Sequence, residues 1–101
     1  MISRVWHGRT APENADAYER LLREDVLPGI HRVAGFRGAM ILRRELGDEI
    51  EFVVITQFDS LDDVRGFAGD DYERAVIEPE ARKLLSAADE RAAHYETVVV
   101  S

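Results

Sequence analysis

The stretch EIEFVVITQF, residues 49–58, decides the fold of this 101-residue chain. Its even positions are apolar or β-branched throughout: Ile50, Phe52, Val54, Thr56 and Phe58. Its odd positions include Val53 and Ile55. Neighbouring residues of a β-strand point to opposite faces of the sheet, so this strand has two mainly apolar faces. Such a strand is typical of a sheet that is covered on both sides.

Two further strands are expected on the N-terminal side of this stretch. Gly47-Asp48 is a turn signal, and it predicts a hairpin between residues 49–58 and a strand at 36–46. Residues 2–9 are rich in Val, Ile and Trp and predict the first strand of the chain.

A helix is expected between the first two strands. Thr10, followed by Pro12 and Glu13, has the composition of a helix start with a threonine cap. Apolar residues at helical spacing extend this helix to about Val26, and Pro28-Gly29 is expected to break or kink it.

The C-terminal half predicts a second helical region and a last strand. Ser60 is expected to cap a helix that ends at Gly69. Residues 70–77 predict a second helical stretch, and residues 80–85 predict a further turn after Pro79. Residues 94–100 are β-rich and predict the final strand.

The order β-α-β-β-α-β predicts one α+β domain, 1–101, with a ferredoxin-like fold and a four-stranded antiparallel sheet. Two helices can cover only one face of such a sheet. The second apolar face of residues 49–58 therefore predicts a partner, and an identical subunit in a symmetric homodimer is the expected one. The alternative is a monomer with one wet face.

Composition excludes several classes of function. The net charge of −7 argues against a nucleic-acid partner, and the one basic cluster (Arg37, Arg43 and Arg44) is large enough only for a small anion. The chain has no cysteine, so disulfides, thiolate metal sites and a cysteine nucleophile are absent. No apolar run is long enough to predict a signal peptide or a membrane span, so we expect no membrane partner and a cytoplasmic protein.

Two of the three histidines fall in strands that this topology makes neighbours. If His7 lay opposite His94, both imidazoles would share one face, whereas a slip of one residue would separate them. Such a pair suits acid–base chemistry near neutral pH. The alternative is a hydrogen-bonded histidine with a purely structural role, and His31 is expected on a loop or the surface. His94 and Glu96 have no further ligands at metal-binding spacing, so no metal site is expected.

Aromatic residues could hold a flat apolar ligand in a cavity between helices and sheet. Trp6 and Tyr72 are the strongest candidates, because each has a polar group that needs a partner when buried. The alternative for most aromatic residues is a place in the core. No glycine-rich loop has the context of a nucleotide site.

Several motifs resemble the antibiotic biosynthesis monooxygenase family. They are Trp6-His7-Gly8, Gly35-Phe36-Arg37-Gly38, Gln57-Phe58-Asp59-Ser60-Leu61, Phe67-Ala68-Gly69-Asp70-Asp71-Tyr72-Glu73, Pro79-Glu80 and His94-Tyr95-Glu96. The resemblance covers nearly the whole chain. The motifs from Phe67 onward look like one uncharacterised bacterial branch of the family. It implies a dimeric α/β barrel with a ligand cavity between the sheet and the helices of each subunit.

The resemblance also implies chemistry. Some relatives oxygenate polyketide-like aromatic substrates without metal or organic cofactor, and others degrade haem. Phe58 stands where the family commonly has Trp, so a mechanism that needs the indole N–H is in doubt. Haem-degrading relatives place an axial His near Val76 and Ile77, which cannot bind iron, so a haem enzyme is disfavoured.

Three functions remain open at this point. The first is a cofactor-independent monooxygenase that acts on a small aromatic or polyketide-like metabolite, with His7 and His94 as catalytic residues. Trp6, Phe58, Phe67 and Tyr72 would bind its substrate. The second is a non-catalytic dimer that binds a small apolar ligand as a sensor or carrier. The third is a structural dimer.

Overall fold

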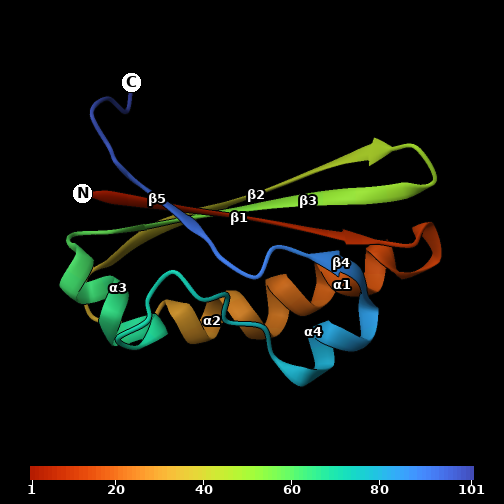
Figure 1. Cartoon of the computed structure of the whole chain (residues 1–101), viewed down its shortest axis with the longest axis horizontal. Helices are drawn as coiled ribbons and strands as arrows, with labels where there is room; N and C mark the ends of the chain where they lie inside the picture. The colour runs from red at the N-terminus through yellow and green to blue at the C-terminus, as the bar shows by residue number, and fades with distance from the viewer.

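The computed structural model describes all residues, 1–101, as one layer of sheet and one layer of helices. In chain order the elements are β1 (Ile2–Thr10), α1 (Ala15–Leu21), α2 (Leu27–Ile30), β2 (Phe36–Leu46), β3 (Glu49–Phe58), α3 (Leu61–Ala68), α4 (Pro79–Leu84), β4 (Leu85–Ala88) and β5 (Ala93–Glu96). The antiparallel sheet has the order β2-β3-β1-β4, and β5 also pairs with β1. All helices lie on one face of the sheet (Figure 1). This is the expected α+β ferredoxin-like fold.

The central hairpin forms at the predicted residues. Leu46 pairs with Glu49, and Gly47 between them has a φ of +63°, a conformation that glycine adopts without steric cost. The Ser60 cap of α3 is also confirmed, because its hydroxyl accepts a hydrogen bond from the Asp63 backbone N–H at 3.2 Å. Gly69 ends the helix with a φ of +89°.

The register of β1 with β3 determines what each face carries. Arg4 pairs with Thr56 and Trp6 pairs with Val54, so the even residues of both strands point to the same face. Arg4, Thr56 and Phe52 are buried on this side. The even face is therefore the one that the helices cover.

The core fills the space between this face and the helices in two clusters. In the first, the rings of Phe52 and Tyr18 meet edge to face, with centroids 4.9 Å apart, beside the buried Leu22. In the second, Phe58 and Val64 are fully buried. Burying each large apolar side chain stabilises the fold by about 1.5–3 kcal/mol, so these residues attach the helices to the sheet.

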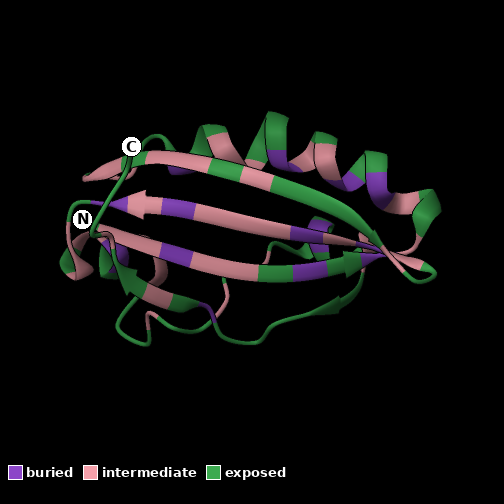
Figure 2. Ribbon diagram, turned by 90° about the horizontal axis from the view of Figure 1, so that it is seen from above, coloured by how far each residue is buried: buried purple, intermediate pink, exposed green.

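The opposite face of the sheet has no cover from its own chain (Figure 2). Met40 and Leu42 of β2 are 56% and 47% exposed, and Tyr95 of β5 is 57% exposed. Between these strands, Val53 and Ile55 of β3 are half-buried. We call these five side chains the open apolar face. The two-faced strand is thus present, with one face packed under helices and the other bare.

The first helical region begins and continues differently from the expectation. Thr10 belongs to β1 and does not cap a helix, since its buried Oγ1 has no hydrogen-bond partner; the chain enters through a 3-10 turn at Pro12–Asn14. Pro28 does not break the helix. A π-helical stretch, Leu22–Val26, joins α1 to α2, and the chain stays helical through Pro28.

The predicted helix at 70–77 is wrong. Arg74 forms a β-bridge with Arg91, and the backbone N–H groups of Ala75 and Ala92 donate to Glu90 and Glu73 across the same gap. The backbone groups of this segment are used in these pairings, so a helix cannot form. Pro79 then keeps the preceding residue extended and starts α4.

The last strands also differ from the prediction. The predicted turn at 80–85 is α4 followed by the unpredicted β4, which pairs with the end of β1. The predicted strand 94–100 is β5, which stops at Glu96. Glu96 pairs with Ile2, where β1 begins, so the residues beyond it have no strand to pair with. Val98, Val99 and Val100 are largely exposed in this tail.

The predicted basic cluster is neutralised. Arg37 makes two hydrogen bonds to the Asp59 carboxylate at 2.6 and 2.7 Å. Arg43 bonds Asp16 and Glu19 of α1, and Arg44 bonds Glu51. Each arginine thus has its own carboxylate, which leaves no shared anion site there. No helix of the chain has both the length and the apolar character needed to cross a membrane.

Candidate functional site

A cavity of about 150 Å³ lies between the helix-covered face of the sheet and the helices. Ten of its 14 lining residues are hydrophobic. Trp6 and Val54 line it from the sheet, Leu22 from the first helical region and Phe67 from α3. Val76, which is 49% exposed, lines it from the loop before α4. The cavity is therefore an apolar site with an edge at the surface.

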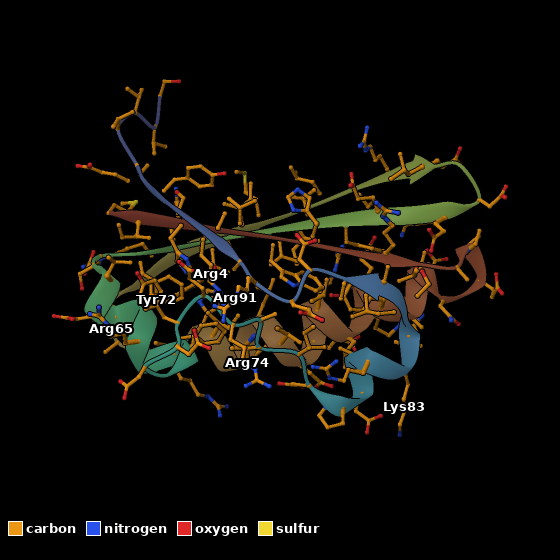
Figure 3. All side chains as sticks on the ribbon, viewed as in Figure 1. Arg4, Arg65, Tyr72, Arg74, Lys83 and Arg91 are labelled. Carbon is orange, nitrogen blue, oxygen red and sulfur yellow. The ribbon has the colours of Figure 1, made fainter.

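Arg4 supplies the cation that lines this cavity. It is 5% exposed, and its side chain extends from β1 toward the loop of Tyr72 and Arg74 (Figure 3). Nη1 donates to the backbone carbonyl of Tyr72, and Nη2 donates to that of Arg74 at 3.1 Å. The guanidinium carbon also lies 5.5 Å from the centre of the Phe67 ring. Arg4 thus joins the sheet to the loop that borders the cavity.

No carboxylate compensates the charge of Arg4. It makes no ion pair with any acidic residue, unlike Arg37, Arg43 and Arg44 at the surface. Burial lowers the pKa of its guanidinium, because removal from water disfavours the charged form. Glu78, the one acidic residue that lines the cavity, is exposed and is not within ion-pair distance of Arg4.

His94 sits behind Arg4. Its Nε2 lies 2.9 Å from Arg4 Nη1. An arginine can only donate, so Nε2 accepts this hydrogen bond and the proton of the neutral ring is on Nδ1. Nδ1 is buried without a partner. Burial and then the charge of Arg4 lower the pKa of His94, which keeps the ring neutral.

The indole ring of Trp6 forms one wall of the cavity and is closely held. Its Nε1–H donates to the backbone carbonyl of Asp89 at 2.8 Å. A Cβ at Gly8 would lie only 2.5 Å from the indole ring and 3.1 Å from Leu85. Glycine at this position therefore makes room for the indole against the sheet.

The structure does not bring His7 and His94 together. His94 pairs with Arg4 across β5 and β1, so His7, three residues further along β1, points to the opposite face. His7 is exposed there, with Nδ1 3.2 Å from Asp89 Oδ2. The register that would place both imidazoles in one chamber is not the one observed. The catalytic roles of the two histidines stay predictions.

The other four predicted site residues divide between cavity and core. Trp6 and Phe67 line the cavity. Phe58 does not; it is fully buried in the second cluster, where its ring stacks on Phe67 with centroids 5.7 Å apart. Tyr72 lies outside the lining, edge to face with His94 at 5.1 Å. Their roles in substrate binding stay predictions.

The residue that sequence reasoning missed is Arg4. Its even position in β1 places it on the same face as Trp6, and that signal was available from strand periodicity alone. The loop carbonyls that hold Arg4 gave no such signal, because the segment was expected to be helical. Burial of Tyr18, a further lining residue, raises the pKa of its phenol, so Tyr18 stays neutral.

Metal-binding side chains do not gather in this chain. No three residues of the types His, Cys, Asp and Glu come close enough together to hold an ion. His31 is exposed and contacts Phe36 edge to face at 4.8 Å. The candidate site thus brings together an apolar cavity, a buried arginine and the histidine bound to it.

Comparison with known proteins identifies one family. The model of the family described as antibiotic biosynthesis monooxygenase matches residues 1–79 of the chain. Among proteins with curated functions, none matches.

Solved structures share the fold at low sequence identity. A candidate antibiotic biosynthesis monooxygenase from Bordetella bronchiseptica is 16% identical, with 97% of each chain covered and a TM-score of 0.66. A point mutant of MhuD with two manganese protoporphyrin IX molecules bound per active site is 17% identical, covering 100% of this chain and 98% of that one, with a TM-score of 0.64. The ActVA-Orf6 monooxygenase of Streptomyces coelicolor, in complex with nanaomycin D, is 17% identical. The match covers 99% of this chain and 92% of that one, with a TM-score of 0.60.

Proposed function

The chain belongs to the antibiotic biosynthesis monooxygenase family, and we propose that it is a cofactor-independent monooxygenase that oxidises a small aromatic metabolite in the cavity beside Arg4. The observation that carries this proposal is the combination in one cavity of aromatic walls, Trp6 and Phe67, with a buried cation. Aromatic walls hold a flat ring, and a buried cation stabilises the anion that such a reaction must form.

The proposed reaction begins with loss of a phenolic or enolic proton. The resulting substrate anion reduces dioxygen directly. A hydroquinone would become a hydroxyquinone: its ring gains one oxygen atom from dioxygen and gives up two hydrogen atoms, which leave with the other oxygen atom as water. The substrate supplies all the electrons that dioxygen takes up, so the reaction requires no external reductant.

His94 is the better candidate for the base. It lies on the helix-covered face and touches Arg4, whereas His7 lies on the open face. The Nε2 lone pair of His94 accepts a hydrogen bond from Arg4, so His94 becomes available as a base only when Arg4 turns that N–H toward the hydroxyl oxygen of the neutral substrate. In this proposal Arg4 then donates to that oxygen while His94 Nε2 takes up its proton, so formation of the anion and its stabilisation are coupled.

A haem-degrading function does not fit the cavity. No His, Cys or Met lines it, and Val76 and Ile77 stand on its wall. A cavity of about 150 Å³ is comparable to one that holds a benzene molecule. A porphyrin is several times larger, so we derive no step through one.

Association of two chains through the open apolar face is part of the proposal. Three of its large apolar side chains, Met40, Leu42 and Tyr95, are about half exposed. A second copy with the same face would cover them in a symmetric dimer, and the exposed valines of the tail would add to the contact. Sedimentation at micromolar concentration tests this, with the mass of two chains expected; the mass of one chain would contradict it.

Dioxygen uptake with single-ring hydroquinones and with anthrone tests the catalytic proposal. We expect enzyme-dependent uptake with a single-ring compound, and one labelled atom in the product when the dioxygen carries oxygen-18. His94→Ala should lose nearly all of this rate, while His7→Ala should keep it. Turnover that is unchanged in His94→Ala would remove the assigned base, and absence of uptake with every compound would remove the oxygenase.

One observation favours a second function, that of a non-catalytic ligand-binding protein. Neither His7 nor His94 is among the residues that line the cavity. A sensor or carrier needs only the apolar walls and Arg4. Saturable binding of an aromatic compound without oxygen uptake would favour this function over the oxygenase.

A further inference from the structure

We propose that the ligand of the cavity is a single-ring aromatic acid whose carboxylate is bound by Arg4. The inference deepens the proposed function by naming the class of substrate. It rests on that function only in placing the ligand in this cavity. Three features carry it: the uncompensated charge of Arg4, the number of its free donors and the size of the apolar space.

The charge of Arg4 needs a negative partner. A buried cation without an ion pair costs several kcal/mol in desolvation. The two carbonyl groups and the His94 nitrogen that accept its hydrogen bonds carry no net charge. The nearest structural alternative, that Arg4 only ties the loop to the sheet, explains these hydrogen bonds and leaves the charge without a partner. A carboxylate ligand would supply that partner.

The donors of Arg4 are not all used. The guanidinium has five N–H groups, and three acceptors account for three of them. The other two are enough for a carboxylate, which accepts two parallel hydrogen bonds from a guanidinium fork. His94 Nδ1 is also buried without an acceptor. The Arg4–His94 pair thus lacks both a negative charge and hydrogen-bond acceptors.

The size of the cavity limits the rest of the ligand. About 150 Å³ of mostly apolar space matches one aromatic ring, so a fused system of several rings would extend past the edge of the cavity into solvent. Trp6 and Phe67 would contact the ring, and Arg4 lies over Phe67. The carboxylate and the ring of one small molecule would therefore meet adjacent parts of the same wall.

Other charges near the site do not provide the same partner. Glu78 is exposed at the edge of the cavity. Arg91 on the neighbouring strand segment already pairs with Asp71 and Glu73. The whole chain carries a net charge of −7, which repels anions. A preference for an anionic ligand would therefore have to come from Arg4 locally.

Benzoate and benzamide test the inference, because they share ring, size and shape and differ in charge. Trp6 is the only tryptophan, so its single indole N–H resonance reports binding in the cavity by NMR titration. We expect wild-type protein to bind benzoate at least about tenfold more tightly than benzamide, as charge-assisted hydrogen bonds require. The Arg4→Gln protein should bind benzoate at least about tenfold more weakly than wild type does and should keep its affinity for benzamide.

Arg65→Gln is the matched control. Arg65 lies over the Tyr72 ring at 5.2 Å but does not line the cavity, so its removal deletes the same charge and should leave benzoate binding unchanged. Equal affinities of wild type for the two probes would overturn the inference and leave the cavity as a ligand site. No response of Trp6 to either probe would overturn the inference together with the proposed location of the function. If Arg4→Gln does not fold, the wild-type comparison alone decides.

Discussion

Val53 and Val54 are consecutive residues of β3 that meet different surroundings. Val54 lines the cavity under the helices, and Val53 belongs to the open apolar face. The same contrast separates His94, held against the buried Arg4, from His7, which is exposed beside Asp89. One strand register thus assigns each side chain of β1 and β3 either to the helix-covered face, which holds the core and the cavity, or to the open face.

The difference shows how one small sheet can serve two purposes. The helices of its own chain close the even face and leave an apolar cavity with a buried charge. The odd face exposes apolar side chains to water, which is unfavourable in free energy. We expect a ligand on the first and a second copy of the chain on the second, and five experiments test that division.

The largest effect should come from core truncation on the helix-covered face. Phe52→Ala removes a fully buried ring that packs on Tyr18 and should lower the free energy of unfolding by about 3–5 kcal/mol. Val53→Ala, the next residue on the other face, should cost about 1.5 kcal/mol or less. Urea unfolding at one protein concentration measures both. Equal losses would contradict the contrast between the faces.

A charge on the open face should act on association. Met40→Glu places a carboxylate where the dimer would bury it, and we expect the dissociation constant to rise about hundredfold or more. Ala17→Glu makes the same charge change on the exposed surface of α1 and is the control. Sedimentation velocity compares the three proteins. A Met40→Glu protein that remains as dimeric as the control would show that this face is not the interface.

Glycine substitutions should distinguish the faces by steric space. A Cβ at Gly8 would meet the Trp6 ring at 2.5 Å, so Gly8→Ala should cost about 1–3 kcal/mol and shift the Trp6 fluorescence. Gly38 lies in β2, and a Cβ added there would meet nothing within 4 Å. Gly38→Ala should therefore change neither the free energy of unfolding nor the Trp6 fluorescence. Urea unfolding followed by tryptophan emission gives both quantities. An unperturbed Trp6 in Gly8→Ala would show that the indole is not fixed there.

The smallest effect should be the pH dependence that His94 contributes. Its pKa in the folded chain is lowered from 6.5, so below pH 6.5 the unfolded chain takes up a proton that the folded chain does not. The contribution of His94 to the free energy of unfolding should be fully present above pH 6.5. It should be lost progressively as the pH falls from 6.5 through the pKa of His94 in the folded chain. His94→Gln should remove this part of the slope in unfolding experiments between about pH 7.5 and 5.5. Identical slopes would contradict the assignment.

The fold was predictable where local signals and tertiary contacts agree. The hairpin of β2 and β3 formed at its predicted residues, because alternation and a Gly-Asp turn both specify it. The helix predicted at residues 70–77 was wrong for the opposite reason. Their helical pattern competes with backbone pairing to residues 90–92, and those partners lie too far along the chain for a local reading to detect.

The site was predictable in part. Strand alternation is enough to place Trp6 on the cavity side, and the same rule would have placed Arg4. The relative placement of His7 and His94 was not accessible, because a shift of one residue between β1 and β5 reverses it. The register depends on where residues 89–92, between β4 and β5, let β5 join β1, and no short motif encodes that position.

Methyl NMR of Val53 and Val54 tests the division between the two faces most directly. On addition of benzoate we predict saturable shifts of the Val54 methyl groups and none at Val53. On dilution through the dimer dissociation range we predict the reverse. Benzoate-induced shifts at Val53 without shifts at Val54 would contradict the account, since they would place the ligand on the face that we assign to the partner chain.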